Sequence, residues 1–204
     1  MQPVLAARRY SVEEYADLLV ASETKLEYWN GDILAMAGNS PAHVSINQRL
    51  SGQCYVQLQI PAARCRVFTS DLAVGLPKSN SYFLPDLSLT CEEPRFEKIK
   101  SVEAFLNPQL IVEILNPSTR NFDEHEKLVA YSSLKTLRHY VLIDSESVWV
   151  RVYSRESSDQ LWQLRFSDSR DGVIEIDPPG LKLSLSDLYA DLEFPAPEPQ
   201  VDFS

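Results

Sequence analysis

The sequence predicts a single α/β domain in which helices flank a mixed β-sheet. Its 204 residues, 44% hydrophobic and 24% charged, fit one globular domain and exclude disordered and coiled-coil classes. The predicted elements run helix, hairpin, helix, strands, crossover helix, strands, an order typical of this class. Apolar residues of both parities in Leu110–Leu115 indicate a strand covered on both faces. We expect the domain to span residues 1–194 and the proline-rich acidic tail, residues 195–204, to be disordered.

Two helices are predicted in the first 60 residues. Ser11 and Glu14 match a capping box, in which each side chain accepts a hydrogen bond from a free amide, so a helix should run through Leu19. Ser40 before Pro41 is a second helix start, and apolar residues then recur at every fourth position to about residue 59. The second helix should therefore bury one apolar stripe.

Between these helices the sequence predicts a β-hairpin. Residues 25–29 and 32–37 are extended runs joined by Asn30-Gly31, a pair that tolerates positive φ at both central turn positions. In that register Glu27 lies opposite an apolar residue, which indicates partial burial. A pairing of Glu27 with an arginine is an equally good interpretation.

Strands dominate the remainder of the chain. They are predicted at residues 66–74, 83–90, 110–115, 140–143, 148–153, 161–166 and 172–176. A helix at residues 123–134 should connect the third and fourth of these strands, and a short helix at residues 185–192 should end the domain.

Several classes of protein are excluded or disfavoured. No apolar run approaches the roughly 18 residues of a membrane span, and acidic residues occupy the place of a signal-peptide core, so we expect a cytoplasmic protein with no membrane partner. The three widely spaced cysteines, Cys54, Cys65 and Cys91, form no C-x-x-C pair and are expected to be buried free thiols. The three histidines have no H-x-x-x-H spacing, which disfavours zinc chemistry.

The formal net charge of −10 is concentrated at the C-terminal end. Residues 156–204 hold 11 acidic and 3 basic side chains, whereas residues 1–155 hold 18 and 16. Phosphate binding draws on lysine and arginine, so tight DNA affinity is disfavoured. The nearly neutral main body still allows a nucleic-acid surface.

Two acidic residues stand out in the strand region. A bare carboxylate at Glu113, inside a strand buried on both faces, would cost several kcal/mol unless it is paired, protonated or metal-bound. A buried ion pair or a strand end that reaches water would also explain it. Asp86, after Pro85, lies at the mouth of another strand and taken alone is an ordinary turn residue. Together the two carboxylates could supply part of an octahedral oxygen shell for a divalent cation such as magnesium.

The predicted helix after these strands carries Lys127 and Tyr131 on one face. The simplest alternative is an exposed Asp123–Lys127 pair, worth only a few tenths of a kcal/mol.

These residues carry a family resemblance. Pro85-Asp86 followed by Glu113 resembles the core of the PD-(D/E)xK nuclease superfamily, although Leu115 stands where that superfamily usually has its lysine. A longer string is similar to the Uma-two family of restriction-endonuclease-like bacterial proteins, in which the lysine lies on the following helix. That string comprises Glu113-Ile-Leu-Asn-Pro-Ser-Thr119, Asp123, Lys127, Tyr131, Tyr140-Val-Leu-Ile-Asp144, Tyr28-Trp-Asn-Gly-Asp32, His43 and the Asp71 strand. The resemblance covers about residues 10–190, with Asn116 where family members more often have serine.

The resemblance implies a restriction-endonuclease-like core with extra strands C-terminal to it, and a Mg²⁺- or Mn²⁺-dependent endonuclease acting on DNA. Asp86 and Glu113 would hold the metal together with the carbonyl of Ile114, and Lys127 would orient water or offset transition-state charge. The accessory candidates are Glu27, His43 and Tyr131.

Three functional hypotheses remain open: an active nuclease, a non-catalytic member that binds nucleic acid or another protein, and a hydrolase of small phosphorylated substrates. A homodimer is also compatible with the sequence.

Overall fold

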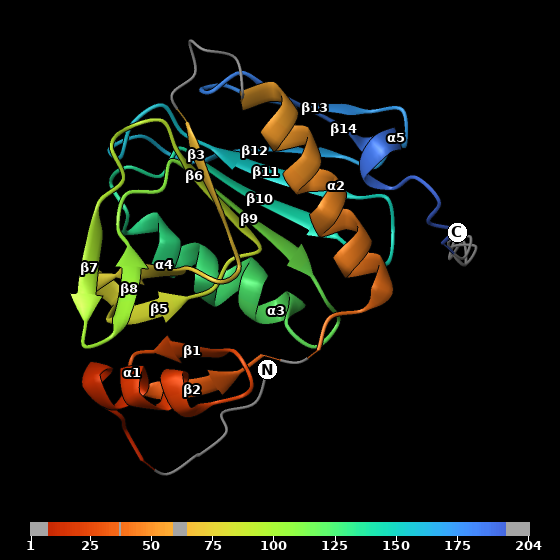
Figure 1. Cartoon of the computed structure of the whole chain (residues 1–204). Helices are drawn as coiled ribbons and strands as arrows, with labels where there is room; N and C mark the ends of the chain where they lie inside the picture. Colours follow the sequence, from red (N-terminus) through yellow and green to blue (C-terminus); the bar gives the residue numbers. More distant parts are fainter. Residues whose placement is uncertain (1–7, 37, 59–64, 195–204) are drawn as a thin grey trace, which may run out of the picture.

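The computed structural model describes residues 8–36, 38–58 and 65–194, and in these residues the strands form two six-stranded sheets and a separate hairpin (Figure 1). The first sheet has the order β2-β1-β5-β4-β8-β7 and the second β12-β11-β10-β9-β6-β3, while β13 pairs with β14. The strands of the first sheet are β1 Leu26–Trp29, β2 Asp32–Ala35, β4 Ala73–Leu76, β5 Ser81–Phe83, β7 Phe96–Ile99 and β8 Val102–Phe105. Those of the second sheet and the hairpin are β3 Arg66–Thr69, β6 Leu87–Thr90, β9 Leu110–Leu115, β10 His139–Asp144, β11 Val150–Ser154, β12 Gln163–Ser167, β13 Val173–Ile176 and β14 Leu181–Ser184.

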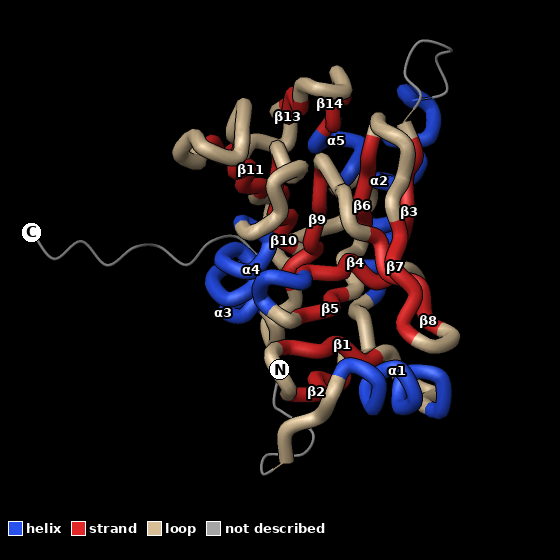
Figure 2. The backbone as a smooth tube through the Cα atoms, turned by 90° about the vertical axis from the view of Figure 1, so that its left-hand side faces the viewer, coloured by secondary structure: helices blue, strands red, loops and turns tan. Residues whose placement is uncertain are grey.

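Helices pack against the faces of both sheets (Figures 1 and 2). Their bounds are α1 Val12–Ala21, α2 Pro41–Leu58, η1 Pro77–Ser79, α3 Arg120–Phe122, the π-helical turn η2 Asp123–Lys127, α4 Leu128–Ser132 and α5 Leu185–Leu188. Helix α2, the β13–β14 hairpin and α5 share a hydrophobic core with one face of the second sheet. Helix α4 packs in a core that takes side chains from both sheets, and α1 covers the other face of the first sheet.

Local signals in the sequence are confirmed at the N-terminal end. The capping box of Ser11 and Glu14 is present at the start of α1. The hairpin pairs Glu27 with Leu34 across an Asn30-Gly31 turn whose two residues both have positive φ. The Ser40 hydroxyl accepts a hydrogen bond from the amide of His43 (3.2 Å) at the start of α2.

The α/β fold with a mixed sheet that the sequence predicts is confirmed, but the strands form more than one sheet, because two predicted strands each divide between two sheets. Residues 66–74 give β3 and β4, separated by a turn in which the Leu72 amide donates to the Thr69 carbonyl (3.2 Å). Residues 83–90 give the end of β5 and then β6, separated by Leu84-Pro85-Asp86. Proline cannot donate to a strand ladder, which favours this break.

Three observed strands were not predicted at all. Strands β7 and β8 form a hairpin whose turn contains Lys100 at φ 53°, a position without the glycine or asparagine that usually signals such a turn. Strand β14 was likewise missed. The predicted helix at 123–134 is instead α3, η2 and α4 in succession, and α5 is shorter than residues 185–192. The tail at residues 195–204 lies outside the described residues.

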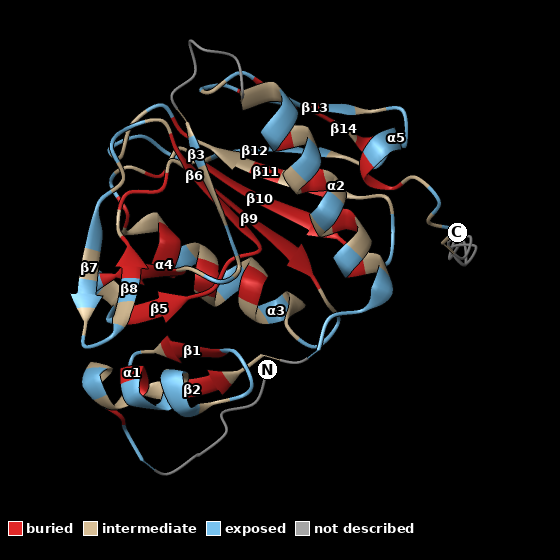
Figure 3. Cartoon of the chain, viewed as in Figure 1, coloured by how far each residue is buried: buried red, intermediate tan, exposed pale blue. Residues whose placement is uncertain are grey.

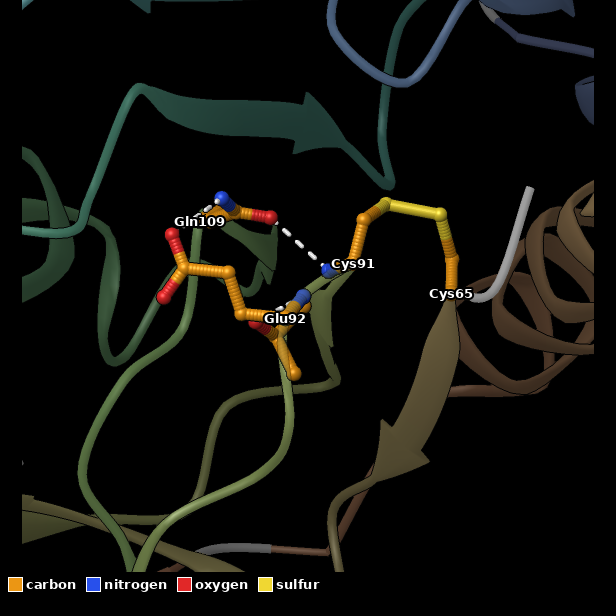
Figure 4. The surroundings of a disulfide bond; sticks show 5 residues. Cys65, Cys91, Glu92 and Gln109 are labelled. Carbon is orange, nitrogen blue, oxygen red and sulfur yellow. Dashed lines mark hydrogen bonds between the residues drawn. A yellow bond between two sulfur atoms is a disulfide. The ribbon is translucent and has the colours of Figure 1, made fainter. Parts of the chain in front are cut away.

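The expectation of three free thiols is wrong for two cysteines, because Cys65 and Cys91 form a disulfide (Figure 4). Arg66 pairs with Thr90 in the antiparallel β3–β6 ladder, so the two cysteines extend that register by one position. The Cys91 amide also donates to the Gln109 side chain (2.8 Å). Cys54 is free and buried, as expected.

Strand β9 lies at the centre of the second sheet, parallel to β10 and antiparallel to β6. All six of its residues are buried, and Figure 3 shows β9 and β10 as the most continuously buried strands. Ile111 and Leu115 contribute to the core under α4, whereas Val112 and Ile114 contribute to the core under α2. None of the described helices is long and apolar enough to cross a membrane.

Candidate active site

Glu113 projects from β9 on the face that α4 covers. Only 4% of the residue is exposed, and its Oε1 atom accepts hydrogen bonds from Lys127 Nζ (3.0 Å) and Tyr131 Oη (2.8 Å). The alternative that Glu113 lies at a strand end exposed to water is therefore wrong. A buried ion pair compensates for this carboxylate, which is the other alternative that the sequence left open.

Lys127 is the hub of the cluster. Its ammonium lies 3.0 Å from Glu27 Oε1, 3.0 Å from Glu113 Oε1 and 3.1 Å from Asp123 Oδ1. The interpretation of Asp123 and Lys127 as an exposed pair is wrong, because only 1% of Lys127 and 3% of Asp123 are exposed. Both residues lie on the π-helical turn, a distortion that is frequent at functional sites.

Glu27 comes to this cluster from the other sheet. It is fully buried on β1, and its Oε1 atom also accepts a hydrogen bond from the Leu84 amide (2.8 Å). Its charged partner is Lys127 and not the arginine that the sequence allowed.

The Asp86 side chain contacts both α2 and β9. It lies directly before β6, and only 5% of it is exposed. Its Oδ1 atom is 2.8 Å from His43 Nε2, and its Oδ2 atom accepts a hydrogen bond from the Ile114 amide (2.7 Å). His43, a lesser candidate in the sequence, thus directly contacts a proposed metal ligand.

One small cavity of about 20 Å³ brings these groups together. Its volume is enough for one water-sized ligand. The cavity is lined by Met36, Asn39, His43, Asp86, Glu113, Ile114, Asn116, Thr119, Asp123 and Lys127. All three principal candidates from the sequence, Asp86, Glu113 and Lys127, are among them. Tyr131 and Glu27 contact the cluster from behind the cavity wall.

The cluster gathers four carboxyl groups around one ammonium, and burial shifts the titration of several of these groups. Burial raises the pKa of Glu113 well above its usual range, and Asp123, Glu27 and Asp86 add to the shift while Lys127 opposes it. Burial likewise raises the pKa of Glu27. Burial alone would lower the pKa of Lys127, but the surrounding carboxylates raise it well above its usual value. The ammonium therefore stays charged at neutral pH.

The donor chemistry fits a magnesium-type ion. Asp86 and Glu113 offer carboxylate oxygens, and the Ile114 main chain lies at the same cavity. Both hydrogen bonds that Glu113 accepts from described residues use Oε1, which leaves Oε2 for a ligand. Among the described residues no group of three His, Cys, Asp or Glu side chains is arranged as a metal site. Magnesium commonly binds through one or two carboxylates and retains several waters, so two carboxylates and a carbonyl are an adequate set.

Sequence analysis named Asp123 in the family string and in a pair with Lys127, but it assigned Asp123 no role in the site. Its spacing of four residues from Lys127 was the available signal, but that spacing is equally common on exposed helix faces. Asn39, which also lines the cavity, carried no signal in the sequence, and Thr119 entered only as part of the string that resembles the family.

Comparisons with known proteins agree with this fold. The model of the Uma2 family, described as "Putative restriction endonuclease", matches residues 12–187. Two uncharacterized proteins of Synechocystis sp. are each 32% identical, one over 91% of this chain and 94% of the relative, the other over 80% and 90%.

The fold is also that of a solved structure. The crystal structure of a protein described as a putative nuclease belonging to DUF820, from Anabaena variabilis, superimposes with a TM-score of 0.71 and 21% identity. The superposition covers 88% of this chain and 97% of that one. The match to the family model spans most of the sequence, so the chain belongs to the Uma2 family of restriction-endonuclease-like proteins.

Proposed function

We propose that this protein is a Mg²⁺- or Mn²⁺-dependent endonuclease that hydrolyses phosphodiester bonds in DNA. The observation that supports the proposal most strongly is that Asp86, Glu113 and Lys127, from three separate elements, line one cavity large enough for a water-sized ligand. Perturbed, buried carboxylates next to a lysine are typical of functional sites.

In this mechanism each residue has one role. Asp86, Glu113 and the Ile114 carbonyl hold the ion, which when bound supplies Lewis-acid activation of the phosphodiester and of the attacking water. Lys127 provides a fixed positive charge for the charge that develops on the phosphoryl oxygens. His43 holds Asp86 in position through its 2.8 Å contact, and Tyr131 does the same for Glu113 through its hydroxyl.

Charge balance also favours a divalent cation. Three buried carboxylates surround one ammonium at about 3 Å, and Asp86 adds a fourth carboxylate at the same cavity. Mutual repulsion of these groups is relieved when a cation enters. We therefore expect magnesium or manganese to raise the melting temperature of the wild type.

The test combines metal-dependent melting with cleavage. Wild type, Asp86→Asn, Glu113→Gln and the exposed control Asp71→Asn are melted with EDTA, Mg²⁺ or Mn²⁺, and each is incubated with plasmid, single-stranded DNA and RNA. We expect a metal-induced rise in melting temperature and metal-stimulated DNA cleavage for wild type and Asp71→Asn only.

Three outcomes would count against the proposal. Equal metal shifts in wild type and Glu113→Gln would remove the ligand role. Retention of nucleic acid without cleavage would favour a non-catalytic binding protein. Release of phosphate from small phosphorylated compounds, without action on polymers, would favour the third hypothesis.

A further inference from the structure

A polar groove adjoins the proposed cleavage site along α2. It is a cavity of about 330 Å³ that shares two lining residues, Asn39 and His43, with the cavity around Asp86 and Glu113. Its remaining lining residues are Val44, Asn47, Gln48, Ser51 and Thr69. We call this set of residues the α2 groove.

The α2 groove follows from the spacing of polar residues on the helix. His43, Asn47 and Ser51 recur at every fourth position of α2 and therefore lie on successive turns of the helix, and Asn39 lies shortly before its start. Tyr55 lies one turn beyond Ser51, outside the α2 groove, and is 66% exposed. From His43 to Tyr55 the distance along the helix axis is about 18 Å.

Two atoms in the α2 groove are buried without a partner among the described residues. These atoms are Nδ1 of His43 and Oδ1 of Asn47. His43 is 97% buried, and its other ring nitrogen is already bound to Asp86. Buried polar atoms are normally satisfied, so His43 and Asn47 each keep unused hydrogen-bonding capacity beside the groove.

The side chains that line the α2 groove indicate which part of a nucleic acid could bind there. No lysine, arginine, aspartate or glutamate lines the α2 groove, so phosphate groups find no counter-charge there. Amides and hydroxyls instead match the donors and acceptors on base edges, and an exposed tyrosine offers a face on which a base can stack. Base edges are accessible in this way when a strand is unpaired.

We propose that the α2 groove binds the bases of a single nucleic-acid strand that leads into the Asp86–Glu113 cavity. Asn47 hydrogen-bonds a base edge, and Tyr55 stacks against a base further along the strand. This inference rests on the proposed function for the direction of the strand, and it predicts a preference for single-stranded over duplex substrates.

The stability of an Asn47 variant separates binding from a structural role. If Asn47 served packing, Asn47→Ala would destabilise the protein. A ligand-binding Asn47 leaves an unsatisfied acceptor in the free protein, so alanine, a better helix former, should leave the melting temperature unchanged or raise it.

The experiment measures fluorescence anisotropy of the full chain with labelled oligonucleotides in EDTA, so that binding is observed without cleavage. Single-stranded DNA, single-stranded RNA of the same sequence and the corresponding DNA duplex are compared for wild type, Asn47→Ala, Tyr55→Ala and the exposed control Asn121→Ala. We expect wild type and Asn121→Ala to bind single strands more tightly than duplex. Asn47→Ala and Tyr55→Ala should each weaken single-strand binding by on the order of tenfold.

Each outcome decides the inference. Tighter binding of duplex, no binding by wild type, or unchanged binding by both Asn47→Ala and Tyr55→Ala would overturn it. Groove-dependent binding by a wild type that cleaves nothing with metal would support this inference while refuting the proposed function. Comparing the affinities for single-stranded DNA and single-stranded RNA shows whether the groove prefers deoxyribose or ribose.

Discussion

Replacing Lys127 by methionine should destabilise the protein in a pH-dependent way. The substitution keeps the length and apolar stem of the side chain but removes the ammonium that lies 3.0 to 3.1 Å from three buried carboxylates. Removing one partner from a buried ion pair typically costs about 3 to 5 kcal/mol, whereas an exposed pair would cost a few tenths. We expect the larger loss, because only 1% of Lys127 is exposed.

The sign of the pH dependence follows from the cluster. In wild type the raised pKa of Lys127 keeps its contribution constant below about pH 10. Burial already raises the pKa values of Glu27 and Glu113, and losing Lys127 removes the charge that opposes this shift. A carboxyl with a raised pKa favours the folded state at acid pH, and this stabilisation is lost as pH rises through the raised pKa. The cost of Lys127→Met should therefore be larger at pH 8 than at pH 5.

Urea denaturation of wild type, Lys127→Met and the exposed control Lys135→Met at pH 5 and pH 8, all in EDTA, measures this difference. The control should stay within about 0.5 kcal/mol of wild type. A loss below about 1 kcal/mol at pH 8, or a loss that is the same at both pH values, would show that the ammonium does not neutralise a buried acidic cluster.

Two further predictions concern residues away from the cavity. Burial lowers the pKa of His139 to about 4, so the contribution of the neutral imidazole to folding stability is present above pH 6.5 and is lost as pH falls toward 4, by up to about 3 kcal/mol. The variant His139→Gln should flatten this part of the plot of unfolding free energy against pH. A plot for His139→Gln as steep as that of the control His125→Gln would contradict the assignment. Gly31 has φ 97°, and an added Cβ would lie 2.8 Å from Arg9 Cδ, so Gly31→Ala should lower the stability measured in thermal melts by about 1 to 2 kcal/mol. The matched control is Gly38→Ala, because an added Cβ there meets open space. Equal melting temperatures of the two variants would refute the claim that Gly31→Ala strains the backbone.

Signals within a few residues of sequence located much of the fold and the principal site candidates. The capping box of Ser11, the turn at Asn30-Gly31 and the double-sided burial of β9 depend on local chemistry alone, and each was predictable. The unusual carboxylate of Glu113 in an apolar strand was visible for the same reason. The sequence also indicated that something must compensate for it.

What the sequence could not supply was pairing between distant segments. The division of strands between two sheets depends on which neighbour each short run meets, and the Cys65–Cys91 disulfide depends on the β3–β6 register. An i,i+4 spacing of Asp123 and Lys127 is the same on an exposed and on a buried helix face. Only the packing of η2 between the two sheets distinguishes these cases.

The position of the lysine illustrates how packing replaces a sequence motif. Leu115 lies two residues after Glu113 on the same face of β9, but it is fully buried in the core beneath α4. Lys127 reaches Glu113 from the helical segment packed over that same face, and it also binds Glu27 on the opposite sheet. One ammonium therefore links β1, β9 and η2, so the proposed catalytic charge is also part of what holds the two sheets together. A loss of cleavage in a Lys127 variant can be assigned to chemistry only after its folding at the same pH has been measured, because the same contacts serve both.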